Sequence, residues 1–190
     1  PLLMAFGIND NTLDPTGLQA VGSRYENEIA AAAYIAETGR GWSEAIKIVH
    51  QAFTEADRVM ESTPAAMFPG CLQSIESFAS AGIKFGIVSA ATTSQVTKFV
   101  EYHRIQVHFQ VLLGSDREFA KPDPRLFQSA CQQLGVNPDR TLMVGDSIWD
   151  MSMASKGGAA GCIGISWGRF GKPLQGADVS IANLSELRVN

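Results

Sequence analysis

The first third of the chain is patterned for helices. One apolar residue recurs every three or four positions, which defines the face of an amphipathic helix: Ile46, Val49, Phe53, Ala56 and Met60. An earlier helix is predicted over 25–36, ending before the glycines at positions 39 and 41. Residues 64–70, with a proline near each end, are predicted to be a connector.

Beyond Gly70, short apolar runs alternate with helical faces. Helices are predicted over the apolar faces at 72–78, 96–100, 126–134 and 151–156, and strands at 83–88, 109–113, 142–144, 162–165 and 179–181. This alternation is typical of an α/β fold with a doubly wound parallel sheet. We therefore expect a helical domain at 1–65 and an α/β core at 66–190. Because the core opens with a helix and not a strand, we expect its first strand to be missing from these residues.

Composition narrows the class of protein. The chain has 190 residues, 45% of them hydrophobic and 18% charged, as in a globular domain. The net charge of −4 argues against a nucleic-acid partner, and no apolar run reaches the roughly 20 residues that span a bilayer. Cys71, Cys131 and Cys162 are odd in number and widely spaced, which favours free thiols in a reducing, cytoplasmic compartment. No secretory signal precedes them.

Two carboxylates follow the predicted strand at 142–144. Asp146 and Asp150 are four positions apart, at the end of a strand where ligands bind in open α/β sheets. Crowded carboxylates repel unless a cation lies between them, and Mg²⁺ prefers such hard oxygen ligands. The alternative is structural: Asp146 caps the next helix, and Asp150 lies on its exposed first turn.

Two further segments lie at strand ends or in the loops after strands. Ser89 follows the strand at 83–88, where a hydroxyl and free amides can cradle phosphate. Lys121 precedes Pro122 in a stiff segment, where a fixed ammonium can offset phosphoryl charge. Each also has a plain interpretation, the first as a helix cap and the second as a solvated surface lysine.

Taken together, these motifs resemble the haloacid dehalogenase-like superfamily, whose members are mostly Mg²⁺-dependent phosphatases and phosphomutases. The order Ser89, Lys121-Pro122, Gly145-Asp146-Ser147 and Asp150 carries the resemblance. The segments 67–70 and 81–89 are similar to the return from cap to core in phosphoglycolate phosphatase-like members. The similarity covers residues 64–187, and residues 1–63 resemble the helical cap.

The resemblance implies a role for each residue. Ser89 would bind the transferring phosphoryl group with the Ala90 amide, and Lys121 would neutralise its charge. Asp146 would ligate Mg²⁺, and Asp150 would support either the metal shell or Lys121. The implied function is hydrolysis of a small phosphorylated metabolite through an aspartyl-phosphate. Ala90 departs from the Asn or Gly often found after the phosphate-binding hydroxyl, so any side-chain contact there is lost.

The resemblance also exposes a gap. The family's first strand carries Asp-x-Asp-Gly-Thr, whose first aspartate attacks phosphorus and whose second acts as acid and base. The printed sequence has no such motif; aligning Thr12-Leu13 with it places Ile8 at the nucleophile. We therefore expect the nucleophile strand upstream of Pro1, and the 190 residues alone to be nearly inactive.

Other functions remain open on the same scaffold. One is a catalytically dead module that senses phosphate or binds a protein, and another is a phosphomutase. Dehalogenation or phosphonate hydrolysis is disfavoured by the metal-binding form of the Gly145–Asp150 motif. In the cap, Arg24, Tyr25 and Glu26 are either substrate-facing or part of a solvated helix surface, and the latter is favoured.

Overall fold

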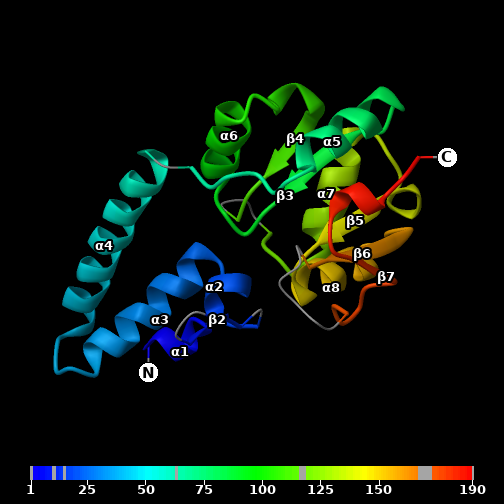
Figure 1. The fold of residues 1–190 in the computed structure, drawn as a ribbon. Coiled ribbons are helices and arrows are strands. Elements are labelled where there is room, and N and C mark those ends of the chain that lie inside the picture. The colour runs from blue at the N-terminus through cyan, green and yellow to red at the C-terminus, as the bar shows by residue number, and fades with distance from the viewer. Residues whose placement is uncertain are drawn as a thin grey trace. The chain divides into compact units, whose positions relative to one another are not determined.

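The chain divides into two compact units, residues 1–65 and residues 66–190 (Figure 1). The computed structural model describes residues 2–9, 12–14, 16–62, 64–115, 119–166 and 173–189. Across those ranges, none of the helices combines the length and the apolar character needed to cross a membrane.

The first unit is a pair of long helices with a small hairpin. Its elements are α1 (Leu2–Ala5), β1 (Ile8–Asn9), β2 (Thr12–Leu13), α2 (Leu18–Val21), α3 (Arg24–Ala36) and α4 (Trp42–Ser62). A reciprocal capping box starts α3: the Ser23 hydroxyl accepts from the Glu26 amide, and the Glu26 carboxylate accepts from the Ser23 amide at 2.7 Å. Small residues let α3 and α4 pack closely, namely Ala31, Ala32, Ala45 and Val49.

The predicted apolar face of α4 is buried only along its first half. Val49 is buried, but Ala56 is exposed and Met60 is 61% exposed. The reason is length: α3 has 13 residues and α4 has 21, so α3 covers only part of its partner.

The second unit alternates helices with strands. Its helices are α5 (Cys71–Ser80), α6 (Thr93–Tyr102), α7 (Pro124–Leu134) and α8 (Ile148–Lys156), with short 3₁₀ turns η1 (Gln106–His108), η2 (Pro138–Arg140) and η3 (Leu184–Glu186). Its strands are β3 (Phe85–Val88), β4 (Phe109–Leu113), β5 (Leu142–Gly145), β6 (Gly161–Ile165) and β7 (Val179–Ile181). This is the mixed α/β architecture that the sequence pattern predicts.

The strands of this unit pair in two parallel pieces. One piece is β3–β4 and the other is β5–β6–β7, with parallel register throughout both. Helix α7 packs on β3, β4 and α8, and α8 packs on β5 and β6, so one helix layer carries both pieces. Within the described strands, β3 and β5 each have a single partner, and each therefore presents an unpaired edge.

Two predicted boundaries are corrected. The strand predicted from Ile83 begins at Phe85, because Gly82 adopts a positive φ of 79° and the Ile83 amide donates to Phe78 O, closing α5. The helix predicted from Met151 begins at Ile148, because a capping box at Ser147 starts it earlier.

Candidate functional site

The centre of the candidate site is an ion pair between the loop that follows β4 and the first turn of α8, which follows β5. Nζ of Lys121 lies 2.5 Å from Oδ1 of Asp150, with the lysine side chain 14% exposed and the aspartate side chain 4% exposed. Lys121 lies between β4 and α7, and Asp150 lies in the first turn of α8, directly after β5. This contact therefore joins the carboxyl ends of the two sheet pieces, where ligands bind in open α/β folds.

Asp150 is fixed from its other side by Ser147. Oδ2 of Asp150 accepts hydrogen bonds from the Ser147 amide at 3.2 Å and hydroxyl at 2.9 Å, and the same hydroxyl accepts from the Asp150 amide. Oδ1, on the other side of the carboxylate, forms the ion pair with Lys121. Because the Asp150 carboxylate is almost fully buried, it depends on these partners to offset the cost of its desolvation.

This arrangement differs from the plain interpretation of the Asp146/Asp150 pair. Ser147, and not Asp146, caps α8, and Asp150 is buried rather than exposed on the first turn. Sequence reasoning missed Ser147, although its signal was present: a serine followed three positions later by an acidic residue is a capping box. Asp146 instead lies exposed immediately after the last residue of β5.

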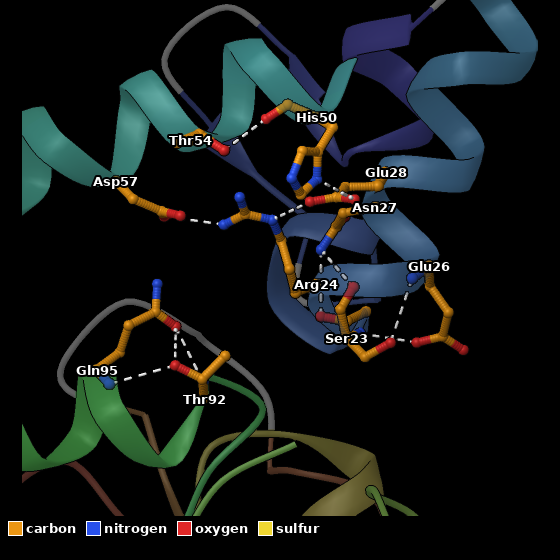
Figure 2. Close-up of polar contacts among 11 residues, drawn as sticks. Ser23, Arg24, Glu26, Asn27, Glu28, His50, Thr54, Asp57, Thr92 and Gln95 are labelled. Carbon is orange, nitrogen blue, oxygen red and sulfur yellow. Dashed lines mark hydrogen bonds and ion pairs between the residues drawn. The ribbon is translucent and has the colours of Figure 1, made fainter. Parts of the chain in front are cut away.

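The loop after β3 is held in place by backbone contacts. The Ser89 amide donates to Leu113 O at 2.9 Å, and the Ser89 hydroxyl accepts from the Ala91 amide at 3.1 Å. Thr92, and not Ser89, caps α6, through a reciprocal box with Gln95 (Figure 2). The cap interpretation of Ser89 is therefore excluded, and its hydroxyl stands at the strand end.

A neighbouring glycine fixes this loop against the end of β4. The Gly114 amide donates to the Thr93 hydroxyl at 3.0 Å, and the Ser115 amide donates to Ala91 O at 2.8 Å. A Cβ on Gly114 would lie 2.1 Å from the Thr93 amide nitrogen, which only glycine avoids. These contacts tie the loop after β3 to the end of β4.

In the first unit, Arg24 joins two helices. Its Nε donates to Glu28 Oε1 at 2.6 Å and its Nη1 donates to Asp57 Oδ1 at 2.8 Å (Figure 2). Its guanidinium also lies 4.6 Å from the Phe53 ring centroid. The hydrogen bond to Asp57 raises the pKa of Arg24 further above its ordinary value. Arg24 thereby links α3 to α4, Glu26 completes the capping box of Ser23 at the start of α3, and Tyr25 is 73% exposed.

The residues at the strand ends fit a hard metal ion that needs few protein ligands. Mg²⁺ typically takes one or two carboxylates and completes its shell with phosphate and water. Asp146 is exposed at the strand end, and both oxygens of Asp150 face Lys121 and Ser147. Over the ranges that the structure describes, no three His, Cys, Asp or Glu side chains gather to hold a metal.

Comparison with known families identifies the scaffold. The model of the haloacid dehalogenase-like hydrolase family matches residues 21–163. The chain belongs to this family. The expectation drawn from the motifs at Ser89, Lys121 and Asp146 is thereby confirmed at the level of the family.

Curated relatives include enzymes with two chemistries. A phosphoglycolate phosphatase from Psychrobacter arcticus is 28% identical over 134 residues, 70% of this chain and 58% of the relative. An (S)-2-haloacid dehalogenase 4A from Burkholderia cepacia is 31% identical over 104 residues, 54% of this chain and 45% of the relative. The chain thus spans about half the length of the curated relatives it matches.

Solved structures share the fold of this haloacid dehalogenase-like chain. A predicted phosphoglycolate phosphatase from Haemophilus somnus superposes with a TM-score of 0.76 at 19% identity, covering 87% of this chain and 76% of its own. CbbY from Rhodobacter sphaeroides, in complex with phosphate, gives a TM-score of 0.62 at 24% identity, covering 74% and 65%. At these identities the likeness concerns the fold alone.

Proposed function

We propose that this haloacid dehalogenase-like protein is a Mg²⁺-dependent phosphatase for a small phosphorylated metabolite of the phosphoglycolate class. The observation that carries the proposal is the buried Lys121–Asp150 pair at the strand ends, beside an exposed carboxylate at Asp146. An ammonium held at a fixed point suits phosphoryl transfer, whose transition state spreads negative charge over the phosphoryl oxygens. The phosphoglycolate phosphatase relatives support this choice of substrate class.

In this proposal each candidate residue has one task. The Ser89 hydroxyl and the Ala90 amide bind phosphoryl oxygens, and Lys121 neutralises their charge. Asp146 holds Mg²⁺, which when bound lowers the charge on the phosphoryl group. Of the two tasks open to Asp150, we assign it the support of Lys121, because its oxygens are taken by Lys121 and Ser147.

The attacking carboxylate is proposed to come from a strand that pairs between β3 and β5. Both strands present unpaired edges within the described fold, and one helix layer carries both sheet pieces. Leu142 and Val144 on β5 also leave apolar side chains 57% and 37% exposed, which an added strand and its neighbours would help to cover. An aspartate at the carboxyl end of that strand would attack phosphorus, expel the alcohol and form the aspartyl-phosphate that water then hydrolyses.

The proposal also covers the role of the helical unit, the cellular compartment and the partners. The helical unit at 1–65 would act as the cap that closes over substrate and excludes water. Cys71, Cys131 and Cys162 form no disulfide with one another, and burial raises the pKa of each thiol. We propose a reducing, cytoplasmic compartment, where free thiols are usual. We propose no membrane or nucleic-acid partner.

A hydrolysis assay tests the proposal. We expect a form carrying an N-terminal Asp-x-Asp strand to hydrolyse p-nitrophenyl phosphate with Mg²⁺ and to stop when EDTA is added. The 190 residues alone should be slower by several orders of magnitude, as for any enzyme without its covalent nucleophile. Equal rates from both forms would remove the added strand from the mechanism.

Two controls separate the alternatives. A Lys121→Met variant of the extended form should lose phosphatase activity, whereas a catalytically dead module would show none in any form. Chloride release from a 2-chloroacid would favour the chemistry named for the dehalogenase relative. Interconversion of sugar phosphates without net release of phosphate would favour a phosphomutase.

A further inference from the structure

The segment that carries Lys121 is short, and each of its residues is half-buried. It runs from Phe119 to Asp123 and is closed as a turn by the Asp123 amide, which donates to Ala120 O at 2.8 Å. A lysine side chain has four rotatable bonds and loses much entropy when it is held still. A lysine that must meet Asp150 at a fixed point therefore needs a backbone that does not move.

Arg125, in the first turn of α7, contacts both flanks of this segment. On one side its Nε lies 3.0 and 3.1 Å from the two carboxylate oxygens of Asp123, and its Nη2 lies 2.5 Å from Oδ2. On the other side its guanidinium lies 4.0 Å from the centroid of the Phe119 ring. Phe119 and Asp123 are the residues two before and two after Lys121.

The Asp123 carboxylate is tied to the helix as well. Asp123 caps α7, and its Oδ1 accepts from the Arg125 backbone amide at 2.9 Å. The Arg125 hydrogen bonds lower the pKa of Asp123 to about 2, so the carboxylate stays ionised throughout the neutral range. One side chain and one helix terminus thus hold the same carboxylate.

We propose that Arg125 is a positioning residue that braces the Phe119–Asp123 segment and so holds Lys121 against Asp150. The functional part of this inference rests on the proposed function, in which Lys121 meets the phosphoryl group. Arg125 is 62% exposed at its side chain, and exposed ion pairs add little to global stability. Arg125 therefore fixes the position of the Lys121 side chain and leaves the free energy of unfolding nearly unchanged. This role needs arginine, because a lysine has neither the planar fork nor the stacking surface.

The first test measures how firmly Lys121 is held, from its acetylation rate and without any ligand. The 190-residue chain is acetylated with N-hydroxysuccinimidyl acetate, and the rate at each lysine is followed by mass spectrometry. In Arg125→Ala and in Arg125→Lys, we expect Lys121 to react about 3- to 10-fold faster than in the wild type, as for a side chain released from one rotamer. Lys84, whose Nζ donates to Leu134 O, is the internal reference and should not change.

A matched variant controls for loss of charge. Arg58 forms a comparable exposed ion pair with Glu55, at 73% and 68% exposure, in the other unit of the chain. Arg58→Ala should leave the Lys121 rate as it is. Unchanged labelling of Lys121 in Arg125→Ala, or wild-type labelling in Arg125→Lys, would overturn the positioning role.

A second test separates this inference from the proposed function. Inorganic phosphate is titrated into the same proteins and followed at the backbone amides of Ser89 and Ala90 by NMR. We expect Lys121→Met to weaken the response strongly and Arg125→Ala to weaken it by about the factor seen in labelling. If Lys121→Met has no effect, or the wild type shows no saturable response, Lys121 does not bind phosphate and the proposed function fails on this point. The acetylation rates still decide separately whether Arg125 positions Lys121.

Discussion

Gly145 and Asp150 are so close that a Cβ on Gly145 would lie 2.5 Å from Oδ2 of Asp150 and 2.6 Å from its Cβ. The last residue of β5 must therefore be glycine for α8 to bring Asp150 back over the strand end. Because α8 can approach Gly145 this closely, Asp150 reaches Lys121. The need for glycine at position 145 therefore helps to set the geometry of the ion pair.

Gly145→Ala tests this requirement. We expect it to lower the free energy of unfolding by about 1–3 kcal/mol, because the added methyl group forces Asp150 away from a packed position. Urea denaturation measures the change. Gly41, where a Cβ would meet nothing within 4 Å, provides the control, and Gly41→Ala should stay within about 0.5 kcal/mol of the wild type. Equal effects from the two substitutions would contradict the crowding at Gly145.

The Lys121–Asp150 pair should behave as a coupled unit. Removing either partner alone, in Lys121→Met or Asp150→Asn, should cost about 3 kcal/mol, because the remaining charged group loses its partner where little water reaches it. The double variant should cost less than the sum of the two, with a coupling energy on the order of 1–3 kcal/mol in a double-mutant cycle.

The exposed pair of Arg40 and Glu44, with side chains 52% and 55% exposed, is the matched comparison. Its coupling energy should be about 0.2–1 kcal/mol, as for other exposed ion pairs. Additive effects at Lys121 and Asp150 would show that solvent screens this pair as well.

The carboxyl of Asp123 should titrate at unusually low pH. Its pKa is lowered from 3.8 to about 2, first by the Arg125 side chain and then by the Arg125 amide. Because the folded pKa is depressed, the contribution of this pair to stability is present above 3.8 and is lost as pH falls toward about 2. Solvent screening of the exposed pair keeps that contribution small. ¹³C NMR of the side-chain carboxyl should place the midpoint near 2 in the wild type and closer to 3.8 in Arg125→Ala.

Asp14 provides the internal control for that titration. Its pKa is also lowered, by hydrogen bonds from the amide and hydroxyl of Thr16, and Arg125 takes no part. The Asp14 midpoint should therefore be the same in both proteins. If the Asp123 midpoint is the same in Arg125→Ala as in the wild type, the low pKa of Asp123 comes from the backbone amide at the helix terminus alone.

Arg24 should stabilise the helical unit through its geometry and not only its charge. Arg24→Ala removes hydrogen bonds to Glu28 and Asp57 and the contact with Phe53, and we expect a loss of about 1 kcal/mol in a partly solvated site. Arg24→Lys should restore little of it, because an ammonium cannot bridge two carboxylates in one plane. Faster native-state hydrogen exchange at the amides of α3 and α4 would report the loss. Full protection in Arg24→Lys would mean that charge alone is enough.

Local patterns in the sequence predicted most of the elements. The spacing of apolar residues located the pair of long helices and the alternation after Gly70, because amphipathic periodicity is a property of neighbouring residues. The boundaries at Phe85 and Ile148 moved because a turn at Gly82 and a capping box at Ser147 competed with the apolar pattern. Both signals were local and readable from the residues themselves.

By itself, the sequence determined the order of helices and strands from α3 onward and the types of residue at the strand ends, but not the β1–β2 hairpin and the short helices before α3. Only the tertiary structure decided that Asp150 is buried against Lys121, that Asp146 is exposed, and that Arg125 contacts both flanks of the Lys121 segment. Local spacing sets which face of a helix a residue occupies. The contact between positions 121 and 150 instead depends on how α7 and α8 pack over separate pieces of sheet, which no short stretch of the chain encodes.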